Sequence, residues 1–378
     1  MKIALFTYRY GTSGSGHAVE QLARYLVTLD HQVSVYDSVG MFDINDGTFV
    51  PHKFLTRIIR VFRNLINSLL RLPLKHAQFV NLNLFQSSLI NIPKTYDLYN
   101  FHWIHNDFIS LREIAEIPSD KILITQHDYW WADGLYHIDI DEEEIPEIYK
   151  KIQRRNLSNI RLLIDQKTNF ICPSNWLRTA FAQKHNGHNP ISHKLFNIVE
   201  TNRTNTKITT NLNTPFKIAI AAWNMNWYKG DDLAKSIIDG FSLINECFEL
   251  HIYGSDKSTV FSNCSYPIIN HGRISQEELF NKLSCMDVLL YCSRFDNLPN
   301  LLIEASLLNL PVVCLDVGGC AEIIKHEVNG FVHKPSDLKG AQTSLNFLSK
   351  ADFQTNSIEI QKEIMKSKTF YKTQYNDK

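Results

Sequence analysis

The sequence lacks any long, uninterrupted hydrophobic run. Hydrophobic residues make up 44% and charged residues 21% of the 378-residue chain, which is a globular composition, and no window is apolar enough to span a bilayer. The first residues, MKIALFTYRYG, soon turn polar and carry no small-residue cleavage site, so we expect no secretion signal. These absences predict a soluble, cytoplasmic protein.

Paired cysteines and an excess of one charge are also missing. The seven cysteines are scattered, with no C-x-x-C pair and none before Cys172, which predicts the reduced thiols of a cytosolic protein. Lys plus Arg and Asp plus Glu each number 39, so the basic surplus usual in nucleic-acid binders is absent. We therefore expect no nucleic-acid partner.

The order of predicted elements indicates two α/β domains. The chain is longer than a usual single core supports. It opens with the strand IALFTY, a Gly/Ser turn, an amphipathic helix and the strand QVSVYD, which is the start of a doubly wound parallel sheet. Further strands fit YDLYNFHW, KILITQHD and NFICPS, and Ser174 could cap the helix that follows the last of them. A polar, Asn- and Thr-rich junction follows near residues 184–215, and the same alternation restarts at FKIAIAAW.

These patterns set the predicted boundaries. We expect a first Rossmann-like domain over residues 1–200 and a second over 201–355. The tail, 356–378, could form a helix that packs back toward the first domain. Two such domains flank a cleft at the carboxyl ends of their strands, where ligands are expected.

The opening Gly/Ser turn has three interpretations. Gly14 and Gly16 form G-x-G, and Asp37 ends the second strand about where a ribose-binding acid of a nicotinamide or flavin site belongs. The third glycine position is Val19, which would crowd the helix against the sheet. The glycines could instead only close the strand onto the helix, or bring backbone amides close to a phosphate.

The segment SRFDNLPNLLIEAS, which begins at Ser293, combines two acids with a helix start. Asp296 follows an apolar strand, and Glu304 lies eight positions on, in a helix that Pro299 helps to begin. A helix start offers backbone N–H groups and a positive dipole end, so it can hold a phosphate without a metal. Glu304 could accept hydrogen bonds from ribose hydroxyls, and Asp296 from another polyol.

This segment, with LPVVCLDVGGCAEII and VNGFV after it, resembles the donor-binding region of family 4 retaining glycosyltransferases of the GT-B fold. The family spaces its two acids E-x7-E, and Asp296 and Glu304 stand at those positions. The resemblance extends to the Gly-rich loop, ITQHDYW, PSNW and WYKG. NFHWIHNDFIS and TQHDYWWADGLYH are most similar to members that build bacterial surface polysaccharides.

The resemblance implies a role for each matching residue. Glu304 would bind the ribose of a nucleotide sugar, Asp296 would touch the transferred sugar, and Lys229 of WYKG would neutralise the diphosphate, whose charge grows as the glycosyl bond breaks. His127 would lie near the donor sugar and the acceptor. The implied catalytic residues are His127, Asp296 and Lys229; the implied donor-binding residues are Gly14, Gly16, Lys229, Asp296, Asn297, Leu298, Pro299, Asn300 and Glu304; and Asp128 and His137 are candidates for the acceptor side.

The sequence departs from the family in the stretch before Lys229. The family carries an arginine in the pattern R-x4-K-G, whereas this chain has Asn224 there and no arginine between Lys217 and Lys229. The diphosphate clamp is therefore weaker or completed from elsewhere. Asp296 in place of glutamate also shortens the reach toward the sugar by one methylene.

Metal sites are not expected. His102, His105, His127 and His137 could suggest zinc, but no spacing matches a metal site on one element. Asp139 and Asp141 form D-x-D, a signature of metal-dependent sugar transferases of another fold, but they sit in the acidic run DIDEEEIPE, which is typical of a solvated helix start. We expect neither a metal nor another cofactor.

The segment from Lys53 to Lys75 is basic and amphipathic. It holds six Lys or Arg residues and no acid, and its apolar residues recur at helical spacing. It could be a peripheral helix that meets anionic lipids. Alternatively, its apolar side packs on the sheet and its basic side faces solvent.

These observations predict a retaining glycosyltransferase that moves a sugar from a nucleotide diphosphate sugar to a saccharide or lipid-linked saccharide. The acceptor oxygen would attack from the face that the diphosphate leaves, without an enzyme nucleophile. The alternatives are a nucleotide-sugar epimerase of similar fold, a non-catalytic sugar-nucleotide-binding subunit and a nicotinamide oxidoreductase.

Overall fold

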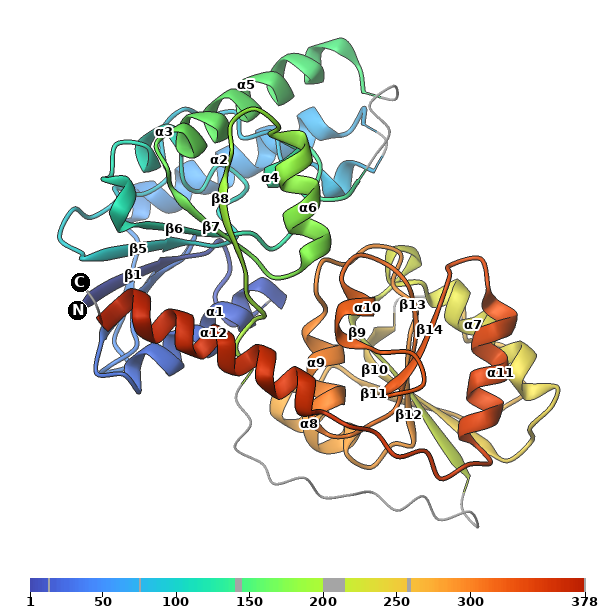
Figure 1. The fold of residues 1–378 in the computed structure, drawn as a ribbon. Helices are drawn as coiled ribbons and strands as arrows, with labels where there is room; N and C mark the ends of the chain where they lie inside the picture. Colours follow the sequence, from blue (N-terminus) through green and yellow to red (C-terminus); the bar gives the residue numbers. More distant parts are fainter. Residues whose placement is uncertain (13, 75, 140–144, 200–214, 257–259, 377–378) are drawn as a thin grey trace. The chain divides into compact units, whose positions relative to one another are not determined.

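A computed structural model describes residues 1–12, 14–74, 76–139, 145–199, 215–256 and 260–376 (Figure 1). The chain divides into two compact units: Met1–Ile198 with Lys366–Lys378, and Val199–Met365. Each unit is built on one largely parallel sheet with helices packed against it. The predicted fold class of two doubly wound α/β domains is confirmed.

The first unit contains an eight-stranded sheet with the order β4-β3-β2-β1-β5-β6-β7-β8. Its strands are β1 (Lys2–Phe6), β2 (Gln32–Tyr36), β3 (Gly40–Asp43), β4 (Phe49–Pro51), β5 (Leu98–Phe101), β6 (Ile122–Thr125), β7 (Asn169–Cys172) and β8 (Ile191–Lys194). The pairs β2–β3 and β3–β4 are antiparallel, and the other pairs are parallel. The sequence analysis predicted the parallel strands β1, β2, β5, β6 and β7 but not the β3–β4 extension.

The helices of this unit cover both faces of the sheet. They are α1 (Gly14–Val27), α2 (Phe54–Arg71), α3 (Leu111–Ile114), α4 (Trp130–Asp133), α5 (Glu147–Asp165) and α6 (Asn175–Lys184), with 3-10 turns η1 (Ala77–Phe79) and η2 (Ser119–Lys121). The predicted cap of α6 is confirmed, because Ser174 Oγ accepts a hydrogen bond from the backbone N–H of Leu177 at 3.1 Å. The last helix, α12 (Ile358–Asn376), ends on the first unit, where Tyr371 is buried against Leu5 and Leu22.

The second unit contains a six-stranded, fully parallel sheet with the order β11-β10-β9-β12-β13-β14. Its strands are β9 (Phe216–Met225), β10 (Phe248–Asp256), β11 (Ile268–Gly272), β12 (Val288–Tyr291), β13 (Val312–Leu315) and β14 (Gly330–His333). Its helices are η4 (Trp227–Lys229), α7 (Asp231–Ser242), α8 (Gln276–Leu283), α9 (Asn300–Leu307), α10 (Cys320–Ile323) and α11 (Leu338–Leu348). Because every strand is parallel, the loops after β9, β11, β12 and β13 all leave from one edge of the sheet.

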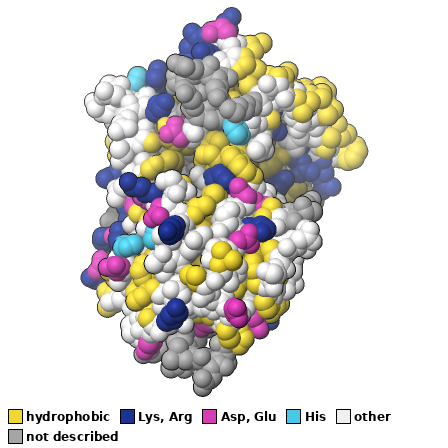
Figure 2. All heavy atoms as spheres, turned by 90° about the vertical axis from the view of Figure 1, so that its right-hand side faces the viewer, with side chains coloured by type: hydrophobic (Ala, Val, Ile, Leu, Met, Phe, Trp, Pro, Cys, Tyr) yellow, Lys and Arg dark blue, Asp and Glu magenta, His cyan; other side chains and the backbone are white. Residues whose placement is uncertain are grey.

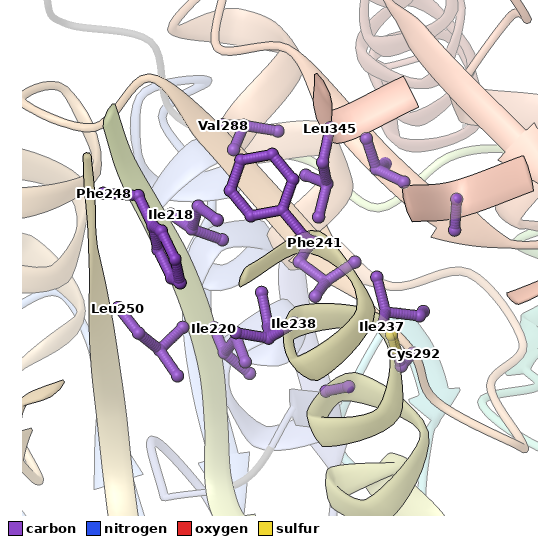
Figure 3. Close-up of a cluster of buried hydrophobic side chains, with 14 of the residues drawn as sticks. Ile218, Ile220, Ile237, Ile238, Phe241, Phe248, Leu250, Val288, Cys292 and Leu345 are labelled. Atoms are coloured by element: carbon purple, nitrogen blue, oxygen red, sulfur yellow. The ribbon is translucent and has the colours of Figure 1, made fainter. Parts of the chain in front are cut away.

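The core of the second unit lies between this sheet and α7. Figure 3 shows Ile238 and Phe241 of α7 on the side of Ile218 and Ile220 of β9, and Ile237 beside Cys292. All six side chains are buried. This packing fixes β9, and with it the turn that carries Lys229.

Helix α2 packs on the protein through its polar side, whereas the packed helix considered in the sequence analysis would have buried its apolar side. Its buried residues are Arg63 and Asn67, whereas apolar residues such as Phe54 and Phe62 are exposed. The interpretation of a packed helix with a basic solvent face is therefore wrong. The cause is a set of buried hydrogen bonds on the polar side, described below.

Two further observations concern membrane-spanning helices and cysteines. Searched over the described ranges, the chain contains no helix of the length and apolar character that crossing a membrane requires. All seven cysteines are free thiols. Asp141 of the D-x-D pair and Lys75 lie outside the described residues.

Candidate active site

Asp296 is the centre of a polar cluster at the carboxyl edge of the second sheet. It stands in the loop that follows β12, and its carboxylate Oδ2 accepts a hydrogen bond from Lys229 Nζ at 2.9 Å and another from Tyr291 Oη at 2.6 Å. The Lys229 and Asp296 side chains remain partly exposed, while Tyr291 is buried. The structure thus brings two of the three predicted catalytic residues together in one ion pair.

Backbone contacts hold the Asp296 loop against the turn that carries Lys229. The N–H of Arg294 donates to the Tyr228 carbonyl at 2.9 Å, and the Arg294 guanidinium forms two 2.7 Å bonds with the carboxylate of Asp232. On the other side, Gly318 has a φ of 55°, and a Cβ there would lie 1.7 Å from the Asp296 carbonyl oxygen. Only glycine fits this position, which explains the first Gly of the VGG stretch.

The ion pair keeps Lys229 charged. Burial by itself lowers the pKa of Lys229, but the charge of Asp296 and the hydrogen bond to it outweigh burial, so the pKa ends above its ordinary value. Burial also raises the pKa of the Tyr291 hydroxyl, and the neighbouring Asp296 carboxylate adds to that shift. Lys229 is therefore a stable ammonium, and Tyr291 a stable hydrogen-bond donor.

Glu304 sits in α9, about one turn after Asn300, where the helix begins. The residue before the helix, Pro299, has no side chain that can cap it. Glu304 is buried, and its Oε1 accepts a hydrogen bond from Gln276 Nε2 at 2.6 Å. The neighbouring Asn297 and Leu298 are buried as well. A ribose hydroxyl would have to share this carboxylate with Gln276 or displace it.

Arg273 stands beside the position where the sequence lacks the expected arginine. It follows β11, and its guanidinium lies 4.6 Å from the centre of the Trp223 ring. Its Nη2 donates to Asn224 Oδ1 at 2.5 Å, and its Nε donates to the Trp223 carbonyl at 3.4 Å. The guanidinium of Arg273, which comes from the loop after β11, is therefore hydrogen-bonded to the side chain of Asn224.

In the first unit, Asp128 gathers several hydrogen-bond donors after β6. Its Oδ1 accepts from the N–H of Trp130 at 3.0 Å, and its Oδ2 accepts from Trp103 Nε1 at 2.8 Å. His105 Nε2 lies 3.5 Å from the same Oδ2. His137 Nδ1 lies 2.7 Å from it, at an angle outside hydrogen-bond geometry. Burial opposes ionisation of Asp128, but the two histidines reverse this effect and hold its pKa well below the ordinary value.

His127 pairs with a second histidine. His127 Nε2 and His102 Nδ1 are 3.0 Å apart, and the two rings stack with centres 5.2 Å apart. Burial lowers the pKa of His127 to about 4, because the charge of His105 adds to the effect of burial and Asp128 only partly opposes it. Both rings are therefore neutral at ordinary pH, and His127 can exchange hydrogen bonds with a hydroxyl group without carrying charge.

His105, Asp128 and His137 offer ligand atoms within 4.8 Å of one another, which is close enough to consider a metal ion. The hydrogen bonds around His105 oppose that use. Asn81 Oδ1 accepts from the N–H of Asn106, so Asn81 Nδ2 is the atom that donates to His105 Nδ1 at 2.9 Å. The proton of His105 is then on Nε2, directed at Asp128. A metal on Nε2 would place a proton on Nδ1 against the Asn81 donor.

Several buried polar atoms at this sheet edge have no hydrogen-bond partner among the described residues. They are Thr7 Oγ1 after β1, Asn100 Nδ2 and His102 Nε2 at the end of β5, and Gln126 Nε2 after β6. Buried polar groups without partners are uncommon and call for a water or a ligand group. Their grouping at the carboxyl ends of adjacent parallel strands is what a polar binding site requires.

The dinucleotide interpretation of the opening turn is not supported. Asp37 is buried, and its carboxylate accepts the backbone N–H groups of Val39 at 2.8 Å and Gly40 at 3.0 Å. It closes the turn into β3 and is not presented to a ribose. Gly14 begins α1, and Gly16 is buried inside that helix.

Sequence reasoning missed the partners that complete these sites. Arg273, Gln276, Tyr291 and Trp103 were not singled out. Tyr291 could have been predicted from the sequence, because it lies five residues before Asp296, at the end of the strand that precedes the Asp296 loop. The other three come from distant elements, and only the order of the strands brings them to the site.

The comparisons with known proteins agree with this geometry. Residues 224–349 match the family described as Glycosyl transferases group 1, so the second unit carries a domain of that group, as the resemblance predicted. The chain is 27% identical to lipopolysaccharide 1,6-galactosyltransferase of Escherichia coli K12 over 161 residues, which cover 40% of this chain and 44% of that protein. It spans less than half the length of the curated relatives that it matches.

Solved structures extend the likeness to the whole fold. The lipopolysaccharide outer core galactosyltransferase WaaB aligns with a TM-score of 0.61 at 13% identity and covers 100% of this chain and 98% of its own. Anabaena HepE in complex with UDP-glucose aligns with a TM-score of 0.55 at 13% identity, over 98% of this chain and 100% of its own. The fold is therefore GT-B, the class expected from the sequence.

The neutral histidines predict how stability depends on pH. His105 and His127 have pKa values of about 4 when folded, against about 6.5 when unfolded. Below about pH 6.5 the unfolded chain binds protons that the folded chain rejects, so the free energy of unfolding falls, by at most about 1.4 kcal/mol per pH unit for each histidine. Urea unfolding at about pH 7 and about pH 5.5 measures this loss.

The matched variants are His127→Asn and His188→Asn. His188 is partly exposed and pairs with Asp165 on the surface. We expect His127→Asn to reduce the loss of stability on acidification and His188→Asn to leave it unchanged. An equal loss in wild type and His127→Asn would contradict the assignment of a neutral, buried His127.

Proposed function

We propose that this protein is a retaining glycosyltransferase that transfers a sugar from a nucleotide diphosphate sugar to a saccharide or lipid-linked saccharide in cell-surface polysaccharide synthesis. The observation that carries the proposal is the ion pair between Lys229 and Asp296. Asp296 lies in the loop just before α9, and both residues belong to the matched glycosyltransferase domain. The E. coli relative is named as a lipopolysaccharide galactosyltransferase, and HepE is named in complex with UDP-glucose. Both names support the proposed substrate classes.

The donor would bind by exchanging one anion for another at Lys229. In the structure, Asp296 neutralises the ammonium. When the donor enters, its diphosphate takes over part of this role beside the start of α9, whose dipole also favours an anion. Glu304 would accept a ribose hydroxyl, and Asp296, still held by Tyr291, would be available to the transferred sugar.

In the proposed reaction, the bond between the anomeric carbon and the diphosphate oxygen breaks while the acceptor oxygen bonds to that carbon on the same face. The acceptor proton passes to the departing diphosphate oxygen. Lys229 stabilises the negative charge that develops there. Neutral His127 would orient a sugar hydroxyl, and Asp128 would position the surrounding Trp103, His105 and His137. Cationic side chains supply the positive charge, so the proposed step uses no divalent metal.

The first test concerns Lys229. We expect Lys229→Ala to lower kcat for donor hydrolysis or transfer by about 100-fold or more, with a smaller effect on donor affinity, because the charge on the leaving group grows toward the transition state. Incubation with a panel of UDP- and GDP-sugars, followed by detection of released nucleoside diphosphate, measures this effect and names the donor.

Lys235→Ala is the matched control, since Lys235 also pairs with a carboxylate, that of Asp239, on the surface of the same unit. It should retain wild-type turnover. Conversion of one nucleotide sugar into another without release of diphosphate would indicate an epimerase. Donor binding without turnover by any acceptor or water would indicate a non-catalytic subunit.

The second test concerns Glu304. Because the side chain is buried beside Gln276, alanine would leave a cavity and an unpaired amide, so Glu304→Gln is the informative change. It keeps the shape and removes the charge that strengthens a hydrogen bond to ribose. We expect donor affinity to fall by about 10- to 100-fold with an unchanged melting temperature. Wild-type affinity, measured by isothermal titration calorimetry, would remove Glu304 from the donor site.

The third test concerns Arg273, which we propose completes the diphosphate clamp in place of the arginine missing at Asn224. Its guanidinium already lies on the Asn224 side chain and over Trp223. We expect Arg273→Ala to weaken donor binding by about tenfold or more, the loss typical of one charge-assisted hydrogen bond. The double variant Arg273→Ala/Asn224→Arg should recover most of the affinity, because it supplies a guanidinium from position 224, whose side chain contacts the Arg273 guanidinium in the wild type.

Asn224→Arg in the wild-type background is the control for this exchange. It places two like charges together and should bind the donor no better than wild type does. If the double variant binds as weakly as Arg273→Ala, Arg273 does not act through this position.

A further inference from the structure

Helix α2 exposes an apolar face that no other described element covers. We call this set the α2 apolar face: Phe54, Leu55, Ile58, Ile59, Val61, Phe62, Leu65, Leu69, Leu70 and Leu72, all exposed, with Phe54 at 77%. Phe49 and Val50 of β4, which ends three residues before α2, are exposed too. Figure 2 shows hydrophobic side chains gathered at the upper right of the face it draws, with Lys and Arg side chains beside them.

The polar side of α2 fixes this orientation. Arg63 is 8% exposed and donates through Nη1 to the carbonyls of Ser87 at 2.8 Å and Asp107 at 2.9 Å. Asn67 is 1% exposed and donates to Asp107 Oδ2 at 2.5 Å. Asn64 Nδ2 donates to the Tyr8 hydroxyl at 2.8 Å. Rotating the helix to bury its apolar side would break these bonds and leave Asp107 with the backbone N–H of Phe85, at 2.8 Å from Oδ1, but without the Asn67 donor to Oδ2.

Apolar patches of this extent are rare on monomers and mark an interaction surface. Charge indicates which partner it meets. The sequence has no Asp or Glu from Gly47 to Tyr96, and Lys53 and Arg57 are exposed at the start of α2, beside the apolar face. An apolar ridge with basic residues at its end and no acids complements the interface of an anionic lipid bilayer.

We propose that the α2 apolar face inserts into an anionic membrane surface, with the helix lying in the plane of the interface. Its 18 residues would span about 27 Å. The inference deepens the proposed function, because a lipid-linked acceptor would lie in the same surface. Only the presence of the acceptor in that surface rests on the proposed function; the attachment of α2 to the membrane does not.

The mode of attachment differs from the one expected from the sequence. The sequence suggested attraction through the arginines of α2. In the structure, Arg60 donates to the Ser38 carbonyl at 2.9 Å and Arg71 to the Val80 carbonyl at 2.9 Å, and Arg63 is bound as described above. These three arginine side chains are hydrogen-bonded within the protein, so attachment depends mainly on the burial of the α2 apolar face in the lipid. Lys53 and Arg57 provide the preference for anionic lipid.

The test is flotation of the full chain with vesicles of phosphatidylcholine alone or mixed with phosphatidylglycerol. We expect wild type to float with the mixed vesicles, and the double variant Phe62→Asp/Leu65→Asp to lose at least about tenfold in partitioning. Raising NaCl from about 0.1 M to about 0.5 M should weaken wild-type binding by less than about tenfold, because screening acts only on the charges.

The matched control is Leu243→Asp/Ile244→Asp, which changes two exposed apolar residues at the end of α7, with Leu243 at 85%. It should float like wild type. Equal flotation of Phe62→Asp/Leu65→Asp and wild type would overturn the proposal. The proposal would also be overturned if wild type bound no vesicle and sedimentation velocity showed a dimer that Phe62→Asp/Leu65→Asp dissociates. A second copy of the chain would then cover the α2 apolar face. Donor hydrolysis, measured without vesicles, reports separately on the proposed function and should be equal in all variants.

Discussion

The carboxylate of Asp296 is the group on which the geometry of the second unit's site depends. It receives a lysine ammonium and a tyrosine hydroxyl on one oxygen, and its backbone lies against Gly318. Asp296 keeps the ammonium of Lys229 neutralised in a partly desolvated position while no other anion is present. In the proposed binding step, an incoming anion would replace an existing partner and would not meet a bare, fully hydrated cation, so little reorganisation would be needed.

The first unit solves a related problem with neutral groups. Asp128 keeps its charge among donors supplied by Trp103, Trp130 and His105, while His105 and His127 stay neutral because burial disfavours their charged form. Neutral imidazoles can donate one hydrogen bond and accept another. This is the property needed to orient sugar hydroxyls, which are themselves both donors and acceptors.

Local pattern was sufficient to predict most of the parallel strands, although not β8, β11 or β14, together with the Ser174 cap and the positions of Asp296 and Glu304 relative to α9. The side-chain partners were beyond its reach. Gln276 meets Glu304 because α8 packs beside α9, and Arg273, which follows β11, reaches Asn224 of β9 across the intervening β10. Both contacts exist only after the sheet has formed. The β3–β4 hairpin was missed because its strands are short and β4 is exposed, so neither carries the buried apolar run that marks the parallel strands.

Helix α2 shows a more general limit of sequence patterns. Amphipathicity states that two sides of a helix differ, but not which side faces the protein. Here the choice is made by Asp107, which is 2% exposed and whose pKa burial raises above the ordinary value despite its hydrogen bonds.

The N–H of Phe85 donates to Oδ1 of Asp107, but without α2 its Oδ2 would be buried with no donor, which costs more than the exposure of a single apolar side chain. The polar side of α2 supplies a donor to Asp107 from Asn67, while Arg63 binds the backbone carbonyl of the same residue. The interior of the first unit therefore selects the polar side of the helix. The apolar side is left outward as a consequence, and only a partner that is itself apolar can relieve its exposure to water.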